Sequence, residues 1–163
     1  MKRYLVFGSN SFSGANFVKF LINKNIQTIG ISRSSQLKKI YLPYFKSKKI
    51  KKFTFYKADI NKDIKKIKKI IQKYKPSYIV NYIAQGMVAE SWANPEDWYQ
   101  TNIVSQTNLY KVLSNYRFIK KIIHVTTPEV YGNNNKKLTE KTKFNPSTPY
   151  AISRMCLDLH LKK

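Results

Sequence analysis

Residues 4–14 read YLVFGSNSFSG, and this stretch decides the fold. Its first four residues form a continuous apolar run, which is typical of a strand buried on both faces. The spacing that follows is Gly-x-x-Ser-x-x-Gly and leads into an amphipathic helix. Glycines at such a turn let the backbone approach a diphosphate, which the first helical amides then bind. We therefore expect a dinucleotide contact at Gly8, Ser11, Phe12 and Gly14, with an ordinary tight turn as the alternative.

Strand and helix patterns alternate along the rest of the chain. Apolar runs predict strands at residues 4–7, 27–31, 53–56, 78–83 and 121–126, and helical periodicity predicts helices from about 13, over 61–74, from 95 to about 116, and from 149. Such alternation indicates the α/β class, a doubly wound parallel sheet (Rossmann fold) of at least five strands. Residues 1–163 are expected to form one incomplete NAD(P)-binding domain. The chain stops in or just after a helix, so we expect truncation before a C-terminal substrate lobe.

The composition fits one globular domain, with 163 residues of which 42% are hydrophobic. A single cysteine, Cys156, and the lack of a long apolar segment predict a cytoplasmic protein with no membrane partner. The formal net charge of +23 would also suit a nucleic-acid binder. Because the lysines lie along helix faces and turns, as Lys65 and Lys66 do, a solvated basic surface is the preferred interpretation and nucleic acid an unlikely partner. Two histidines and one cysteine predict no metal site.

The residues that end the second and third strands bear on the choice of cofactor. Ser32, Arg33 and Ser34 follow the second strand with no acid nearby, and an arginine there suits a ribose 2′-phosphate. This pattern favours NADP over NAD, and a surface arginine is the alternative. Asp59 ends the third strand, where its carboxylate could accept from the adenine amino group or cap the next helix.

Four segments of the chain resemble the extended short-chain dehydrogenase/reductase superfamily, and most of all its nucleotide-sugar 4,6-dehydratases and epimerases. They are residues 8–14, residues 58–60, residues 81–85, and residues 126–132 taken together with 150–154. The resemblance implies a nucleotide-diphosphate sugar as the substrate, oxidised transiently at C4 by a bound nicotinamide. It also implies a role in polysaccharide precursor synthesis and a homodimer.

The resemblance also assigns roles to individual residues. Tyr150 would be the catalytic base, Thr127 its hydroxyl partner, Glu129 the base at sugar C5 and Arg154 the positive charge beside the tyrosine. A packed aromatic and a strand-end cap are the alternatives for Tyr150 and Thr127. The cofactor would be contacted by Asp59, Ile60 and Ala84, which follow strands, and by Tyr150 and Arg154 on the last helix.

Two positions depart from the family pattern. Arg154 replaces the lysine that follows the tyrosine by four residues; it keeps the positive charge but does not release a proton. Pro128 replaces the acid between Thr127 and Glu129, so a proton donor for dehydration is missing there. Dehydratase and epimerase both stay open, as does a non-catalytic dinucleotide-binding protein, and the 163-residue chain alone is expected to bind cofactor weakly without turnover. Asn102 is expected on an inner helix face in a structural role.

Overall fold

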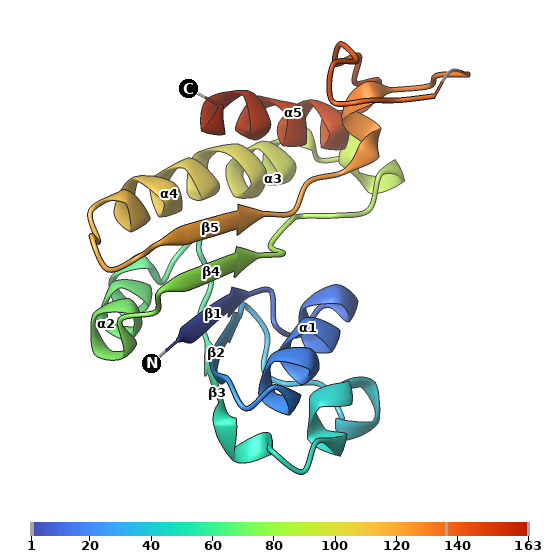
Figure 1. The fold of residues 1–163 in the computed structure, drawn as a ribbon. Helices are drawn as coiled ribbons and strands as arrows, with labels where there is room; N and C mark the ends of the chain where they lie inside the picture. The colour runs from blue at the N-terminus through green and yellow to red at the C-terminus, as the bar shows by residue number, and fades with distance from the viewer. Residues whose placement is uncertain (1, 136, 163) are drawn as a thin grey trace. The chain divides into compact units, whose positions relative to one another are not determined.

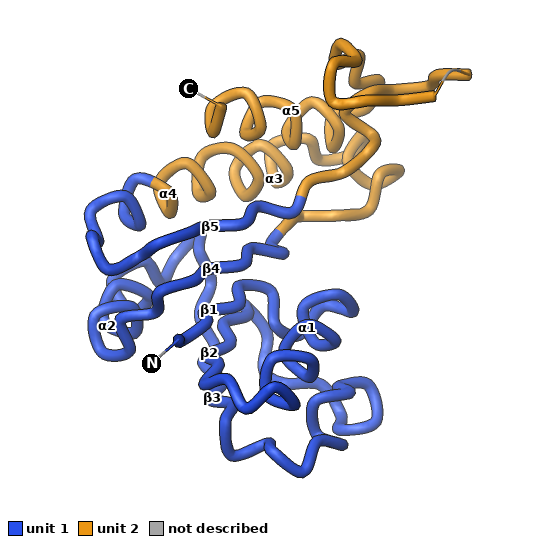
Figure 2. Tube along the Cα trace, viewed as in Figure 1, with its two compact units in different colours: residues 1–83, 111–125 blue, residues 84–110, 126–163 orange. Residues whose placement is uncertain are grey.

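The computed structural model describes residues 2–135 and 137–162. The chain divides into two compact units, shown in different colours in Figure 2. Unit 1 comprises residues 1–83 and 111–125, and unit 2 comprises residues 84–110 and 126–163. Among the described residues, no helix has both the length and the apolar character needed to cross a bilayer.

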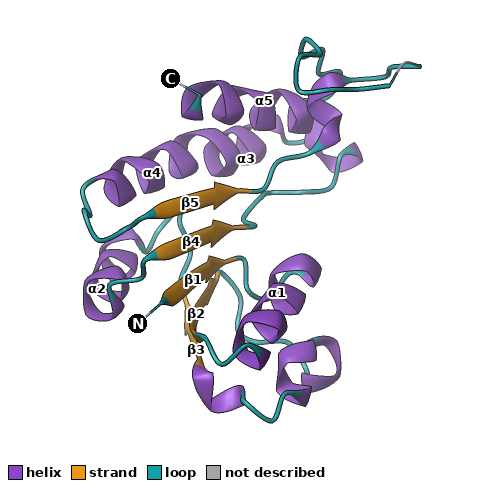
Figure 3. Ribbon diagram, in the orientation of Figure 1, coloured by secondary structure: helices purple, strands orange, loops and turns teal. Residues whose placement is uncertain are grey.

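Unit 1 contains a parallel sheet of five strands in the order β3-β2-β1-β4-β5, drawn in orange in Figure 3. The apolar run at the start of the chain is the central strand, and its Leu5, Val6 and Phe7 are at most 1% exposed. A parallel sheet of this order confirms the predicted Rossmann fold. The strands are β1 (Arg3–Phe7), β2 (Gln27–Ser32), β3 (Phe53–Lys57), β4 (Tyr78–Asn81) and β5 (Lys121–His124).

The helices of unit 1 cover both faces of the sheet. The connections from β1 to β3 run toward one edge and the later ones toward the other, so right-handed crossovers place α1 (Phe12–Asn23) and α2 (Ile64–Tyr74) on opposite faces, as Figure 1 shows. The buried face of α1 packs against Leu42 and Tyr44 of the segment between β2 and β3. That segment forms three 3₁₀ turns that the sequence did not predict: η1 (Lys39–Tyr41), η2 (Pro43–Lys46) and η3 (Ile50–Lys52).

Two predicted strands end earlier than expected. β4 stops at Asn81, where the side-chain Oδ1 accepts the N–H of Ile83 at 3.0 Å and the chain leaves the sheet. β5 stops at His124, which pairs with Asn81 as the last residue of the shared register. The predictions of strands over 78–83 and 121–126 were therefore too long, because apolar residues continue past the last paired position.

Unit 2 is mainly helical. A long helix was predicted from residue 95, and the structure confirms it with one interruption: α3 (Pro95–Tyr99) passes through a π-helical segment, η5 (Gln100–Ser105), into α4 (Gln106–Ser114). The last residues of α4, from 111 on, already belong to unit 1. Asn94 occupies the cap position before α3 but makes no side-chain capping bond. The remaining elements are the 3₁₀ turns η4 (Ala89–Trp92) and η6 (Pro128–Tyr131) and the helix α5 (Pro149–Leu161), which packs against α3 and η5.

Candidate functional site

The corner between β1 and α1 requires both of its glycines. Gly8 has a φ of +74°, a backbone conformation that residues with a side chain rarely adopt. A Cβ on Gly14 would lie 2.2 Å from the carbonyl oxygen of Gly8, so the helix start and the strand end touch backbone to backbone. The geometry gives a physical reason for the Gly-x-x-Ser-x-x-Gly spacing.

The hydroxyl of Ser11 connects the two glycines of this corner by hydrogen bonds. Its Oγ donates to the carbonyl of Gly8 at 2.8 Å and accepts the N–H of Gly14 at 3.1 Å, which makes it the N-cap of α1. Among the described residues, the N–H groups of Phe12 and Ser13 have no hydrogen-bond acceptor. These two amides stand at the positive end of a 12-residue helix, which is the arrangement that binds a diphosphate.

The residues after β2 separate into a buried serine and an exposed pair. Ser32 is 6% exposed, and its Oγ accepts the N–H of Asn10 at 3.0 Å and lies 3.3 Å from the Oγ of Ser9. The hydroxyl of Ser32 therefore braces the phosphate corner. Arg33 and Ser34 are exposed at the end of the strand, so they are the members of this segment that a ligand can reach.

Asp59 lies in the turn between β3 and α2. Its Oδ1 accepts the N–H of Asn61 at 2.9 Å, and its own N–H donates to Oδ2 of Asp63 at 2.9 Å. The N-cap position of α2 belongs to Asp63, so the carboxylate of Asp59 stabilises the preceding turn and does not cap the helix. A contact with adenine stays a prediction, as it does for Ile60, whose side chain is 4% exposed.

All four predicted catalytic residues lie in unit 2. Thr127 is the N-cap of η6, and its Oγ1 accepts the N–H of Glu129 at 3.3 Å. In this bond the hydroxyl oxygen of Thr127 is the acceptor, so the hydroxyl hydrogen of Thr127 takes no part in it. Glu129 is exposed, and the turn closes at Gly132, where a Cβ would lie 2.0 Å from the carbonyl oxygen of Asn145.

Tyr150 is held by its backbone at the start of α5. Pro149 is the first residue of the helix, and Thr148 caps it by accepting the N–H of Ala151 at 3.1 Å. The N–H of Tyr150 donates to Oγ of Ser91 at 3.2 Å, and its carbonyl accepts from Oγ of Ser153 at 2.7 Å. The position of the tyrosine is therefore fixed on both sides of its Cα.

Arg154 follows Tyr150 by one helical turn and is 3% exposed. Burial lowers the pKa of its guanidinium, while the Tyr150, Asp158 and Tyr110 side chains act in the opposite direction. An arginine with a lowered pKa still carries its proton at neutral pH. Farther along α5, burial raises the pKa of Asp158, although the hydrogen bond from Oγ1 of Thr126 and the nearby Arg154 and Lys162 charges counteract it. The helix thus places a buried positive charge beside Tyr150.

Comparison with known proteins now decides the family. A family model described as GDP-mannose 4,6 dehydratase matches residues 5–163. The chain belongs to this family. UDP-glucuronate 4-epimerase of Thermodesulfobacterium geofontis is 26% identical over 163 residues, covering 98% of this chain and 50% of that protein. dTDP-glucose 4,6-dehydratase of Xanthomonas campestris pv. campestris is 28% identical over 171 residues, covering 97% and 47%.

A solved structure in the same group is DesIV, a dTDP-glucose 4,6-dehydratase from Streptomyces venezuelae with NAD and TYD bound. It superposes with a TM-score of 0.82 at 25% identity, over 96% of this chain and 49% of that one. These matches confirm the resemblance to nucleotide-sugar dehydratases and epimerases of the extended short-chain type. The chain spans about half the length of the curated relatives it matches.

Within this GDP-mannose 4,6 dehydratase family member, the side chain of Asn102 connects the loop at Gln85 to Ser153 of α5. It is 1% exposed in the π-helical segment; its Oδ1 accepts the N–H of Gln85 at 2.8 Å, and its Nδ2 donates to the carbonyl of Gln85 at 3.0 Å and to Oγ of Ser153 at 2.9 Å. The predicted structural role is confirmed. The loop beginning at Ala84, a predicted cofactor contact, is thereby joined to the helix of Tyr150. The roles of Ser91 and Ser153 were missed, because no local pattern marks a serine whose hydroxyl accepts a hydrogen bond from a residue far away in the sequence.

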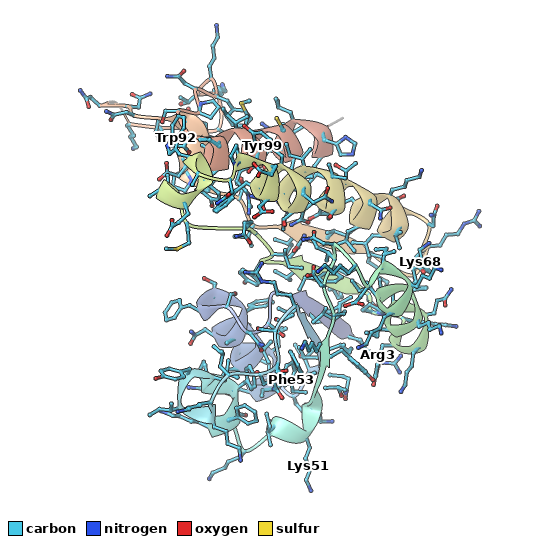
Figure 4. All side chains as sticks on the ribbon, turned by 180° about the vertical axis from the view of Figure 1, so that it is seen from behind. Arg3, Lys51, Phe53, Lys68, Trp92 and Tyr99 are labelled. Carbon is cyan, nitrogen blue, oxygen red and sulfur yellow. The ribbon has the colours of Figure 1, made fainter. Side chains whose placement is uncertain are left out.

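The positive charge of this family member is concentrated in unit 1. Unit 1 has 24 basic and 2 acidic residues, a net charge of +22, whereas unit 2 has 7 basic and 6 acidic residues, a net charge of +1. Lys51 and Lys68 of unit 1 extend away from the backbone in Figure 4. The excess positive charge is therefore unevenly distributed, since the unit with the phosphate corner carries nearly all of it.

Proposed function

We propose that this chain is the NAD(P)-binding part of a nucleotide-sugar 4,6-dehydratase or 4-epimerase that acts through transient oxidation at sugar C4. The observation that carries the proposal is the placing of the buried Arg154 one turn after Tyr150, in a chain whose family and relatives have these activities. A cytoplasmic location and a homodimer stay predictions.

The residues of the phosphate corner fit a dinucleotide. The Phe12 and Ser13 amides would bind the diphosphate, and the absence of a side chain at Gly14 keeps the corner closed behind them. When bound, the nicotinamide supplies the acceptor for the hydride from C4.

The residues of unit 2 would handle the protons. Tyr150 would take the proton of the C4 hydroxyl, and the guanidinium of Arg154 would stabilise the phenolate that results. Thr127 would donate its unused O–H to the same sugar oxygen. Glu129 would remove the C5 proton in a dehydration, but Pro128 has no proton to give to the departing hydroxyl, so dehydration would need another donor.

We also propose that NADP is favoured over NAD. Arg33 and Ser34 are exposed at the end of β2, and residues 1–58 contain no acid at all. A ribose 2′-phosphate would meet positive charge there, whereas the acid that usually binds a free 2′-hydroxyl is missing from that strand end. Titrating the chain with NADPH and NADH, by nicotinamide fluorescence, tests the preference: equal affinities would refute it.

The catalytic proposal is tested by Tyr150→Phe in the full-length protein. The variant should lose reduction of the nicotinamide on addition of UDP-, dTDP- or GDP-sugars, while its affinity for NADPH stays within about twofold. Tyr41→Phe is the matched control, because Tyr41 is 69% exposed in η1 and should change neither measurement. Sugar-dependent reduction that survives in Tyr150→Phe would refute the role of this tyrosine.

A further inference from the structure

Asn10 connects the phosphate corner to the loop that follows β2. Its Nδ2 donates to the carbonyl of Ser35 at 2.9 Å and to the carbonyl of Ser34 at 3.3 Å, and it lies 3.5 Å from Oγ of Ser34. Its backbone N–H donates to Oγ of Ser32 at 3.0 Å. One residue of the phosphate corner therefore holds the loop at several points.

The side chain of Asn10 is also bonded to a buried tyrosine, Tyr44. Tyr44 is fully buried in the core cluster beside α1, and its hydroxyl accepts from Nε2 of Gln36 at 2.9 Å and donates to Oδ1 of Asn10 at 3.5 Å. Burial raises the pKa of Tyr44, and the hydrogen bond from Gln36 lowers it in part. The side chains of Asn10 and Gln36 thus share an anchor in the core, so the loop between Ser34 and Gln36 is fixed at both ends.

This bonding fixes the direction of two amides. In a trans peptide the carbonyl of one residue and the N–H of the next point in opposite directions. Because the carbonyls of Ser34 and Ser35 point toward Asn10, the N–H groups of Ser35 and Gln36 point away from it. Neither N–H has a hydrogen-bond acceptor among the described residues, and both residues are exposed. Two outward-facing donors therefore lie two and three residues after Arg33 in the chain.

We propose that Asn10 is a specificity-determining positioning residue, which holds the Ser35 and Gln36 amides so that they and Arg33 receive the 2′-phosphate of NADP. This inference rests on the proposed preference for NADP. Asn10 need not touch the phosphate, since its contribution is to remove the freedom of the loop before the ligand arrives. Preorganised donors of this kind raise affinity because less ordering remains to be done on binding.

The test compares two probes that differ only in the 2′-phosphate, adenosine 2′,5′-bisphosphate and adenosine 5′-monophosphate, by titration calorimetry. Asn10→Ala should weaken binding of the 2′,5′-bisphosphate about tenfold and that of the 5′-monophosphate by less than about twofold. The 5′-monophosphate is spared because the backbone bond from residue 10 to Ser32 survives the substitution. Asn16→Ala is the matched control: among the described residues the side chain of Asn16 bonds the carbonyl of Phe12 in its own helix and nothing else, and neither affinity should change.

Hydrogen exchange at residues 34–36 separates this inference from the proposal it rests on. Faster exchange in Asn10→Ala, together with the selective loss of affinity, supports the positioning role. Unchanged exchange, or an equal loss for both probes, overturns it even if the wild type prefers NADP. If the wild type shows no preference for the 2′,5′-bisphosphate over adenosine 5′-monophosphate, the NADP proposal fails. The phosphate role of Asn10 fails with it, although faster exchange in Asn10→Ala would still show that Asn10 holds the loop.

Discussion

Replacing Gly14 by alanine should destabilise the protein, although the same substitution stabilises most helices. Gly14 lies in the first turn of α1, and Gly→Ala inside a helix usually gains up to about 1 kcal/mol. Here the new Cβ would lie 2.2 Å from the carbonyl oxygen of Gly8 and 2.9 Å from Oγ of Ser11. A carbon atom and a carbonyl oxygen that are not bonded to each other stay at least about 3.3 Å apart. The backbone of the corner must therefore move by about 1 Å.

The size of the effect follows from what that movement breaks. The bonds from Oγ of Ser11 to Gly8 and from Gly14 to Oγ of Ser11 are each worth about 1 kcal/mol. Inserting a methyl group into a packed site lowers the free energy of unfolding by about a further 1–3 kcal/mol. After the helix gain is subtracted, Gly14→Ala should lower the free energy of unfolding by about 2–4 kcal/mol. The Phe12 and Ser13 amides move with the corner, so ADP affinity should also fall.

Urea unfolding followed by circular dichroism measures the first effect and titration calorimetry with ADP the second. Gly86→Ala is the control, because a Cβ at that residue would have no described atom within 4 Å apart from those of the residue and its two chain neighbours. It should change the free energy of unfolding by less than about 0.5 kcal/mol. The reasoning is refuted if Gly14→Ala is as stable as the wild type, because the corner would then accept a side chain without rearranging.

Three other predictions follow from the same structure. Asn102→Ala removes three hydrogen bonds of a buried side chain and should lower the free energy of unfolding in urea by about 3 kcal/mol. Asn108→Ala, at an exposed position of α4, should lower it by less than about 0.5 kcal/mol. Burial raises the pKa of Asp158, so above that pKa the ionised carboxylate lowers the free energy of unfolding. This destabilisation disappears as the pH falls toward the ordinary pKa of 3.8. Asp158→Asn should therefore gain stability at neutral pH and lose that gain in acid; a gain that persists in acid would refute this cause. The affinity for adenosine 2′,5′-bisphosphate should fall moderately as the salt concentration rises. A much steeper fall in the affinity for an oligonucleotide would instead indicate a nucleic-acid site.

The central strand and the helices that flank it could be predicted because their periodicity is local. Residues 5–7 are buried and belong to a continuous apolar run, and three isoleucines of α2, Ile67, Ile70 and Ile71, lie on the face that the structure buries. The π-helical segment at residues 100–105 has no such local periodicity, and its Asn102 side chain bonds Gln85, seventeen positions away, a contact that sequence order alone does not reveal. The same limit hid the brace at Asn10: an asparagine in a turn is common, and its partners become visible only when the second strand lies beside the first.

The distribution of charge separates two electrostatic tasks. The lysines of unit 1 are mostly exposed, so they attract anionic nucleotides over a distance that salt shortens to about 10 Å or less. Unit 2 has a net charge of only +1, so it offers a phenolate at Tyr150 little general positive field. A single buried guanidinium at Arg154 is screened much less by salt than exposed lysines are, and it acts at the range of one helical turn. Ligand capture by the protein should therefore depend on ionic strength, whereas stabilisation of the proposed phenolate depends on one side chain.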